Sequence, residues 1–345
     1  MPIALVLEKE RQLALRDMDL DLTVGDHDVR VAMDVVGICG SDVHYYRHGR
    51  IGPFVVREPM ILGHEGAGTV VACGRAVQHL AVGDRVCIEP GIPDFSSRPS
   101  RIGLYNLDPS LTFWATPPVH GCLTPDVVHP ASLAYKLPDN VSAAEGAMVE
   151  PLAVGLQAVH KTGVAAGDVA LVLGAGPIGI LVALSALSAG CARVLMFDPA
   201  SAKLDLAAQY FGIQTLRATN GALAEQVLNA TQGWGVDLVY ECSGASAAFK
   251  GVADCIRPGG TLACIGMPIE PVPIDIVALQ VKEIRVVTVF RYANVYDRAI
   301  SLMAQGKIDV KPLISATYPF RDSIEAFERA DAARPDDVKI QITVR

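Results

Sequence analysis

The first 140 residues alternate between short apolar, β-branched runs and turn-forming residues, which is the pattern of β-strands joined by tight turns. Four such runs are residues 3–7, 29–36, 68–73 and 84–88. Turn residues such as Val82-Gly83-Asp84 separate them. We therefore expect a β-rich first part of the chain.

The pattern changes after residue 88. Residues 89–118 form a long, irregular, proline-containing stretch, and loops of that length in compact domains usually serve a function. Ser142 followed by Glu145 has the form of a capping box, which predicts that a helix starts there. We expect this helix to continue through Glu150 and to be kinked by Pro151, turning Glu150 out of the regular helix.

Residues 168–290 alternate between buried-type strands and helix-like segments. This alternation predicts a parallel sheet covered by helices on both faces, which is an α/β doubly wound arrangement. A helix-like segment follows at residues 295–306, and a β-branched strand ends the chain at residues 338–344. The expected strands are residues 169–173, 193–197, 236–240, 260–265 and 284–289. We expect one discontinuous domain, residues 1–155 and 291–345, and one inserted domain, residues 156–290.

A glycine-rich motif joins the first expected parallel strand to a helix. Gly174-x-Gly176-x-x-Gly179 is the dinucleotide-binding fingerprint: the glycines allow a tight turn, close approach of a pyrophosphate and close helix packing. Asp198 follows 19 residues after Gly179 (198 − 179), at the end of the next strand, where an acid binds the cofactor ribose. Its carboxylate would repel the 2′-phosphate of NADP, so we expect NAD. The alternative is a purely structural turn with a helix-starting Asp198, and Lys203 is either a ribose ligand or a solvated surface lysine.

Composition narrows the class of protein. The chain has 345 residues, 51% of them hydrophobic, with 29 Lys+Arg against 37 Asp+Glu. The resulting net charge of −8 argues against binding to nucleic acid. There is no uninterrupted membrane-length apolar run, and no basic segment precedes an apolar one at the N-terminus, so we expect a cytoplasmic protein. The eight cysteines form no Cys-x-x-Cys pair, which argues against a disulfide framework.

Two segments of the first domain carry residues of zinc-ligand type. Cys39 lies between Gly37 and Gly40, and His64 and Glu65 are adjacent within a glycine cluster. Thiolate, imidazole and carboxylate together suit a catalytic zinc, which needs three protein ligands and an open position. A lone cysteine or histidine is more often a buried thiol or a core imidazole, but the His-Glu pair beside a dinucleotide fingerprint favours the metal.

The motif Gly63-His64-Glu65-x-x-Gly68-x5-Gly74 resembles the zinc signature of the zinc-containing medium-chain alcohol dehydrogenases. Residues 39–45, 115–118, 149–152 and 290–292 resemble its sorbitol/xylitol branch, and residues 104–106, 113–122 and 290–298 most resemble bacterial xylitol dehydrogenases. The resemblance implies a GroES-like catalytic domain, a Rossmann NAD-binding domain and a homotetramer. It also implies reversible, NAD-dependent oxidation of a polyol, xylitol to D-xylulose.

The same resemblance assigns residue roles. Cys39, His64 and Glu65 would hold the zinc, and Glu150 would ligate it or hold its water. Two bound carboxylates would give the site a charge of −1 and weaken its acidifying effect on an alcohol, so we expect one glutamate to bind at a time. Ser41 and His44 match the proton-relay positions, although Ser41 also suits a simple turn hydroxyl. The expected substrate contacts are Tyr45, Phe113, Thr116, Glu150, Arg291 and Tyr292, and the expected cofactor contacts are Gly174, Gly176, Pro177, Ile178, Gly179, Asp198, Lys203, Ile265, Phe290 and Arg291.

One departure from the family concerns its second, structural zinc, which four cysteines hold in many members. The corresponding positions here are Asp94, Ser97, Ser100 and Asp108, so we expect one catalytic zinc per chain and no structural zinc.

Three alternatives to the interpretation as a xylitol dehydrogenase stay open. One is sorbitol/L-iditol 2-dehydrogenase, a second is a zinc dehydrogenase acting on threonine or a simple alcohol, and a third is a non-catalytic NAD-binding protein. Arg291 and Glu150 argue against simple alcohols, although Arg291 also suits an interdomain salt bridge. The complete set of metal ligands argues against the non-catalytic protein.

Overall fold

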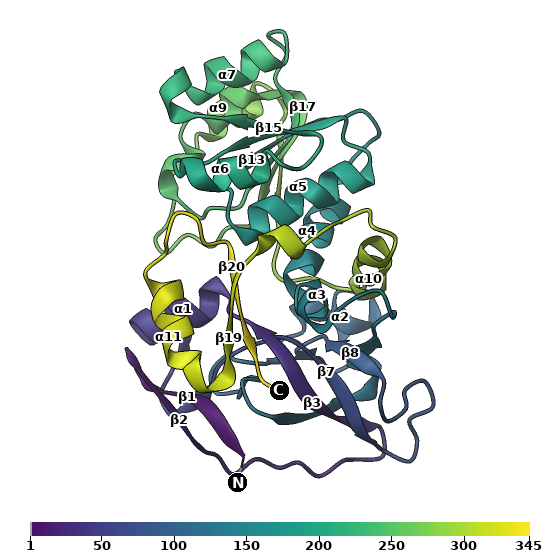
Figure 1. Cartoon of the computed structure of the whole chain (residues 1–345). Helices are drawn as coiled ribbons and strands as arrows, with labels where there is room; N and C mark the ends of the chain where they lie inside the picture. The colour runs from purple at the N-terminus through teal and green to yellow at the C-terminus, as the bar shows by residue number, and fades with distance from the viewer. Residues whose placement is uncertain (1) are drawn as a thin grey trace. The chain divides into compact units, whose positions relative to one another are not determined.

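The computed structural model describes residues 2–345, apart from the side chain of Asn220, and the chain divides into two compact units. Unit 1 comprises Met1–Glu150 and Tyr296–Arg345, and unit 2 comprises Pro151–Val295. Figure 1 shows the course of the chain through both units. None of the helices formed by the described residues has the length and apolar composition needed to cross a membrane.

Unit 1 is built on a seven-stranded sheet in which β3 is the longest strand. β3 pairs antiparallel with β7, β11 and β20. Most of its side chains, in the sequence DVRVAMDVVG, are buried. A smaller sheet of β2, β1 and β6 accompanies it. The strands are β1 Ile3–Lys9, β2 Gln12–Asp17, β3 Asp28–Gly37, β6 Met60–Ile61, β7 Glu65–Cys73, β8 Arg85–Ile88, β11 Asp126–Pro130, β12 Ala134–Lys136, β19 Ile314–Pro319 and β20 Lys339–Thr343. The four strands expected in this part of the sequence are thereby confirmed.

The strand β20 lies between β3 and β19 in the sheet of unit 1. Gln341 lies opposite Gly37 and Ile342 opposite Val36, so the last strand pairs with β3 across some 300 positions of sequence. The helices of this unit include α1 Gly40–His48, α10 Tyr296–Ala304 and α11 Ser323–Asp331. The expected return of the chain end, and the expected helix and strand near residues 295–306 and 338–344, are confirmed.

The stretch of residues 89–118 contains short elements rather than none: β9 Gly91–Ile92, α2 Arg98–Arg101, η1 Tyr105–Leu107 and β10 Thr112–Phe113. Hydrogen bonds hold together the lobe that contains Asp94, Ser97, Ser100 and Asp108. The Asp94 N–H donates to Asp108 Oδ2 at 2.5 Å, and the Ser97 and Ser100 hydroxyls are 3.0 Å apart. This lobe is held by side-chain hydrogen bonds, and one zinc per chain stays a prediction.

A buried carboxylate, Glu89, lies at the base of that stretch. It is 1% exposed and accepts hydrogen bonds from the hydroxyls of Tyr105 at 2.6 Å and Tyr135 at 2.9 Å. Burial raises the pKa of Glu89 to about 7, and the two hydroxyls offset part of that rise. His129 Nε2 lies 2.8 Å from the Glu89 carbonyl oxygen, and burial lowers the pKa of this histidine to about 4.

The expectation of one kinked helix around Glu150 is wrong. The capping box of Ser142 and Glu145 starts α3 Ala143–Gly146, and a separate helix, α4 Val149–Thr162, begins after two intervening residues. Pro151 therefore lies in the first turn of α4, where a backbone N–H has no intrahelical acceptor and proline is tolerated. Glu150 occupies the start of a new helix instead of a kink.

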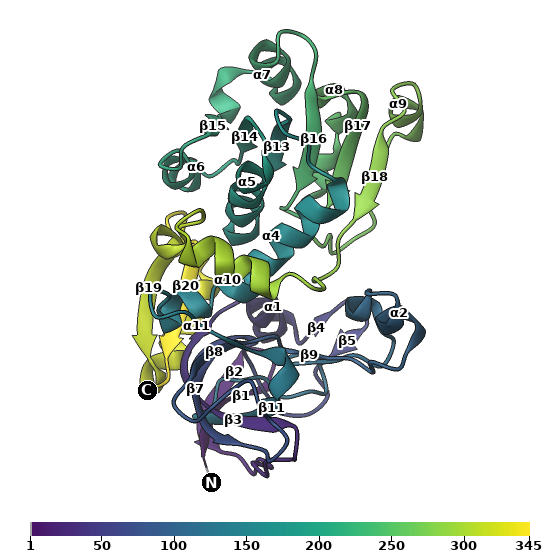
Figure 2. The same cartoon turned by 90° about the vertical axis from the view of Figure 1, so that its right-hand side faces the viewer.

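Unit 2 is a six-stranded parallel sheet in the order β15-β14-β13-β16-β17-β18 (Figure 2). α5 packs on β13 and β14 and α6 on β14 and β15, whereas α8 contacts α7, α9 and β17. The strands are β13 Val169–Leu173, β14 Arg193–Phe197, β15 Ile213–Leu216, β16 Val236–Glu241, β17 Ile256–Cys264 and β18 Arg285–Thr288; the helices are α5 Pro177–Ala189, α6 Ser201–Ala207, α7 Leu223–Ala230, α8 Val252–Cys255 and α9 Ile276–Gln280. Sequence reasoning found five of these strands and missed the short edge strand β15.

The strand order of unit 2 reverses between β13 and β16. The chain runs outward from β13 through β14 to β15, and then returns to the other side of β13 with β16. In open α/β sheets a ligand binds in the crevice outside the carboxyl ends of the strands at such a reversal. The loop that follows β13 is the glycine motif, so the fold places it at this point.

Candidate functional site

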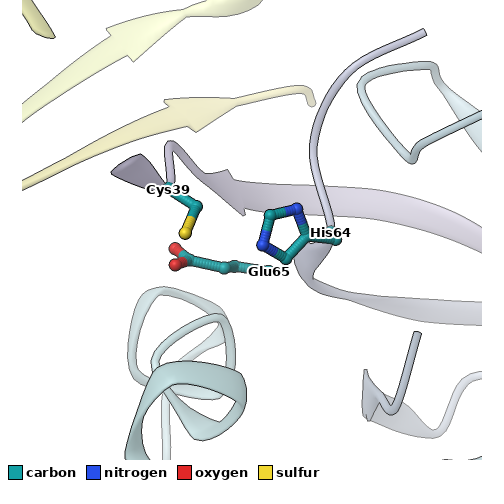
Figure 3. Close-up of side chains that lie close together, drawn as sticks. All are labelled: Cys39, His64 and Glu65. Carbon is teal, nitrogen blue, oxygen red and sulfur yellow. The ribbon is translucent and has the colours of Figure 1, made fainter. Parts of the chain in front are cut away.

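Two adjacent strands of unit 1 bring Cys39, His64 and Glu65 together. β3 ends at Gly37 and β7 begins at Glu65, and these two residues are register partners. Cys39 follows as the N-cap of α1, and His64 precedes β7 by one residue. The ligand-type atoms of the three side chains lie within 4.8 Å of one another, the one such group among residues 2–345. Figure 3 shows the three side chains pointing toward a common centre.

Glycine is required next to this centre. A Cβ at Gly37 would lie 2.1 Å from Glu65 Oε2, so only glycine leaves room for the carboxylate. Gly63 adopts a φ of +89°, a left-handed conformation that orients the chain into His64. The glycines that flank the candidate ligands are therefore part of the site's geometry.

Asp42 contacts two of the candidate ligand residues, Cys39 and His64, and was not predicted from the sequence. It is fully buried and accepts hydrogen bonds from the N–H groups of Cys39 and Gly63, each at 3.0 Å. Its Oδ1 lies 3.6 Å from His64 Nδ1, a buried nitrogen without a hydrogen-bond partner among the described residues. Burial would raise the pKa of Asp42, but the His64 ring and the two N–H donors hold it below its ordinary value. A carboxylate behind a ligating imidazole is the usual way to fix the ring and its tautomer.

Lys339 is the second residue that sequence reasoning missed. It begins β20 and is 3% exposed, and its Nζ lies 2.7 Å from both oxygens of Glu65 and 3.1 Å from the Ile38 carbonyl oxygen. Burial lowers the pKa of Lys339, but the charges of Glu65 and Cys39 outweigh it and raise the pKa above the ordinary value. The lysine thus neutralises Glu65 within the buried site.

The charges of the cluster favour a cation at its centre. Burial lowers the pKa of His64, yet Asp42 and Cys39 raise it well above its ordinary value. Two negatively charged groups therefore face His64, and this arrangement favours a positive charge beside them. Thiolate, imidazole and carboxylate are also the donor types that zinc prefers, so the residues present fit a zinc ion.

Glu150 lies outside the group of three but within electrostatic range of it. It is 7% exposed in the first turn of α4, and its charge contributes to the raised pKa of Lys339. The geometry places the two glutamates differently: Glu65 belongs to the cluster, whereas Glu150 approaches from another element.

The candidate relay and substrate residues of unit 1 lie on elements next to the cluster. Ser41 and His44 are three residues apart on α1 and so face the same side of that helix. His44 Nδ1 is 3.0 Å from the Arg50 carbonyl oxygen, which leaves Nε2 for another partner. The buried Phe113 ring is 5.7 Å from the His64 ring. Tyr45 is also buried, and the Thr116 N–H donates to the Phe113 carbonyl at 3.1 Å.

The glycine motif of unit 2 has the geometry that a dinucleotide loop needs. Gly174 has a φ of +103°, and a Cβ at Gly179 would lie 1.8 Å from the Gly174 carbonyl oxygen. A Cβ at Gly176 would meet nothing within 4 Å, so the loop is open at that position. Pro177 is the first residue of α5, and the N–H groups of Ile178 and Gly179 belong to the first turn, whose donors have no intrahelical acceptor. The loop therefore fits a pyrophosphate.

Asp198 has a structural task in addition to any cofactor contact. Its Oδ2 accepts from Ala175 N–H and its Oδ1 from Ala200 N–H, each at 2.7 Å. The carboxylate thus holds the glycine loop against the end of β14. Lys203 lies in the first turn of α6, close in sequence to Asp198.

The remaining candidate residues of unit 2 follow β17 and β18. Ile265 is buried, and its N–H donates to the Glu241 carbonyl oxygen at 2.8 Å. Arg291 has a φ of +54°, and its Cζ lies 4.9 Å from the centre of the Phe290 ring. Tyr292 is buried. Ile265 therefore lies at the carboxyl end of the sheet, and the Arg291 guanidinium stacks on the ring of Phe290.

Comparisons with known proteins agree with both units. Residues 25–139 match the alcohol dehydrogenase GroES-like domain, and residues 177–305 match the zinc-binding dehydrogenase family. The D-xylulose reductase of Morganella morganii is 55% identical over 95% of this chain and 97% of its own. The sorbitol dehydrogenase of Rattus norvegicus is 43% identical over 89% of this chain and 87% of its own. A crystal structure of an Escherichia coli oxidoreductase/dehydrogenase of unknown specificity is similar over 100% of both chains, with a TM-score of 0.95 and 32% identity. The expected fold, a GroES-like unit and a Rossmann-like parallel sheet, is confirmed.

Proposed function

Since the chain belongs to the zinc-containing medium-chain dehydrogenase family, we propose that it is an NAD-dependent polyol dehydrogenase that interconverts xylitol and D-xylulose. The observation that carries the proposal is the convergence of Cys39, His64 and Glu65 in the GroES-like unit of a chain whose other unit has a dinucleotide loop. The name of the Morganella relative supports the substrate.

Zinc would be held by Cys39, His64 and Glu65, with Glu150 as the alternative carboxylate. Bound there, zinc would act as a Lewis acid that makes an alcohol hydroxyl more acidic. Lys339 compensates the charge of Glu65, so this buried carboxylate is not left as a bare charge. We propose one zinc per chain, because the lobe of residues 94–108 is held by hydrogen bonds and offers no thiolate.

The proton released from the alcohol needs a route away from the buried cluster. Ser41 and His44 on one side of α1 provide a hydroxyl and an imidazole in sequence, and His44 is held by its contact with the Arg50 carbonyl. We propose that Ser41 passes the proton to His44 Nε2.

Polyol binding needs polar groups for the hydroxyls that do not reach the metal. Tyr45, Thr116 and Glu150 of unit 1 can supply them, and Phe113 can line an apolar wall beside His64. Arg291 and Tyr292 of unit 2 are the further proposed substrate contacts. Arg291 is also a proposed cofactor contact. These assignments follow the resemblance of residues 290–292 to the polyol branch.

Cofactor binding falls to unit 2, and the cofactor supplies the hydride acceptor of the reaction. Gly176 leaves space for a pyrophosphate, and the first turn of α5 offers N–H groups to it. We propose NAD over NADP because the carboxylate of Asp198, at the end of β14, would oppose a 2′-phosphate. Lys203, Ile265 and Phe290 complete the proposed cofactor contacts.

The experiment that tests the function is a panel of initial rates on xylitol, sorbitol, ribitol, mannitol and ethanol with NAD. The proposal expects the highest kcat/KM for xylitol and a poor rate for ethanol, together with about one zinc per chain by elemental analysis. Sorbitol as the best substrate would favour the alternative of a sorbitol/L-iditol 2-dehydrogenase, to which the rat relative points. No turnover of any polyol by a zinc-loaded sample would refute the function.

We also propose a cytoplasmic homo-oligomer, a tetramer by the resemblance. β18 is an edge strand of the unit 2 sheet. Apolar side chains are exposed on this strand (Val286), on α9 (Ile276 and Val277) and directly after α9 (Val281). Exposed apolar edges are usually covered, and pairing of two copies along such an edge is one way to cover them. Light scattering after size-exclusion chromatography measures the oligomeric state.

A further inference from the structure

A buried carboxylate lies at the carboxyl end of the unit 2 sheet and was not singled out by any motif. Glu241 ends β16 and is fully buried. Its Oε1 accepts from Ser243 N–H at 2.8 Å, from Gly244 N–H at 2.9 Å and from the Ser243 hydroxyl, and its Oε2 accepts from Gly244 N–H at 3.2 Å. The side chain therefore folds back on the loop that follows its own strand.

This loop touches the glycine motif at the reversal point of the sheet. Cys242 N–H donates to the Leu173 carbonyl at 2.9 Å, and a Cβ at Gly174 would come within 3.1 Å of Ser243. On the other side, a Cβ at Gly266 would lie 2.8 Å from Glu241 Oε2. Glu241 is thus the centre around which the loops after β13, β16 and β17 meet.

The charge of Glu241 has no cationic partner among the residues that the structure describes. All of its hydrogen-bond donors are backbone N–H groups or a hydroxyl, and none of the ion pairs formed by residues 2–345 includes it. Its negative charge acts on its surroundings: it adds to burial in raising the pKa of the Cys242 and Cys264 thiols. A charge held by dipoles alone still projects a field into the crevice above it.

The position of the charge relative to a bound dinucleotide follows from the fold. A doubly wound sheet binds one mononucleotide over each half, on either side of the reversal. Asp198 at the end of β14 assigns the adenosine ribose to the β13–β15 half, so the nicotinamide half belongs over β16–β18, where Glu241 lies. The nicotinamide ring carries a positive charge when oxidised and none when reduced.

We propose that Glu241 favours the oxidised cofactor, because its unpaired charge attracts the nicotinamide cation and gains nothing from the neutral reduced ring. The proposal rests on the proposed function, in that it takes NAD as the cofactor of unit 2. The pyrophosphate is repelled equally in both forms, so it cancels from the ratio of the two affinities. The consequence for the enzyme is that reduced cofactor is released more readily, whereas among the bound states the pair of oxidised cofactor and alcohol is favoured over the pair of reduced cofactor and ketose.

The test is isothermal titration of NAD⁺ and NADH against the zinc-loaded full chain, wild type and Glu241→Gln. The expected result is a decrease of the ratio Kd(NADH)/Kd(NAD⁺) by about threefold to tenfold in the variant, which a loss of one charge at this range predicts. Ser243→Ala is the matched control, because it removes a hydrogen bond of the same loop and keeps the charge. Its two affinities should change by the same factor.

Several outcomes would overturn the proposal. An unchanged ratio in Glu241→Gln refutes it, and an equal change of ratio in Ser243→Ala shows that loop geometry, not charge, sets the preference. Where Glu241→Gln does not fold, Glu241→Asp keeps the charge and must keep the wild-type ratio even if both affinities fall; a shifted ratio there refutes the electrostatic account. Wild-type protein that binds neither NAD⁺ nor NADH refutes the proposed function instead, so the two failures are distinguishable.

Discussion

Replacing Glu89 by glutamine should remove a pH dependence from the stability of unit 1. Burial raises the pKa of Glu89 from 4.5 to about 7. The native carboxyl therefore keeps its proton at pH values where the unfolded chain has lost it. A group of this kind contributes stability below its unfolded pKa, and that contribution is lost as the pH rises through the native pKa. Wild-type protein should thus lose stability between pH 4.5 and 7 through this residue.

The magnitude follows from the size of the shift. The difference between 7 and 4.5 corresponds to about 3 kcal/mol over the full window. Between pH 5 and pH 8 the free energy of unfolding of Glu89→Gln should therefore rise relative to wild type by about 2–3 kcal/mol. Any constant effect of the amide on the contacts with Tyr105 and Tyr135 cancels, because only the change with pH is compared.

Urea unfolding followed by tryptophan fluorescence measures this effect. The chain has two tryptophans: Trp114 is buried in unit 1, and Trp234 is exposed in unit 2. A Trp234→Phe background therefore reports unit 1 alone. Saturating zinc is kept in all samples, because metal affinity itself depends on pH.

Glu145→Gln is the matched control for Glu89→Gln. Although burial opposes it, hydrogen bonds from Ser142 lower the pKa of Glu145. Its stabilising contribution is present above the unfolded pKa and is lost as the pH falls through the lower native value. The difference between this variant and wild type should stay nearly constant from pH 5 to 8. Parallel pH profiles for wild type and Glu89→Gln would refute the reasoning about Glu89.

Four further predictions concern the candidate site. Asp198→Ala should narrow the NAD-to-NADP ratio of kcat/KM, and an unchanged ratio would show that Asp198 serves only the glycine loop. Cys39→Ser should abolish turnover and lower the zinc content while leaving NAD binding, measured by calorimetry, within about twofold, since the dinucleotide loop belongs to unit 2; lost NAD binding would contradict that separation. Arg291→Leu should lower kcat/KM for xylitol far more than for 2-propanol, because the polyol hydroxyls lose a donor at about 1–3 kcal/mol; equal losses would assign Arg291 to the cofactor. Lys339→Met should destabilise chelator-treated protein in urea by about 3–5 kcal/mol, because Glu65 is left as an unpaired buried charge, and added zinc should recover part of the loss; no difference from chelator-treated wild type would contradict the buried ion pair.

The elements with the strongest local pattern could be predicted from the sequence almost to the residue. The strands expected at residues 169–173 and 193–197 are β13 and β14 as the structure has them, because fully buried parallel strands are continuous apolar runs. β15 was missed because Ile213–Leu216 is four residues long and includes the exposed Gln214. The break between α3 and α4 was missed because Pro151 suits the first turn of a helix as well as a kink, and the sequence does not distinguish the two.

For the candidate site, local motifs were informative and distant partners were not. Cys39, His64 and Glu65 stand in short, glycine-rich segments, and the pairing of β3 with β7 brings them together. Lys339 lies 274 residues from Glu65, so no spacing rule connects the two. Asp42 had a weak signal, since it lies three residues after Cys39 where a helix begins.

Because β20 pairs with β3, the sheet of unit 1 can be completed only after unit 2 has been synthesised. Unit 2 is one uninterrupted segment, Pro151–Val295, and all of its strands have been synthesised before residues 296–345. Unit 1 lacks β19, β20 and the Lys339 that neutralises Glu65 until the residues after unit 2 have been synthesised. A nascent chain can therefore fold its dinucleotide unit first, whereas the cluster of Cys39, His64 and Glu65 reaches its final charge balance only after Lys339 has been added. Truncation of even the last seven residues would remove β20 and leave a chain with an intact nucleotide fold and an incomplete metal centre.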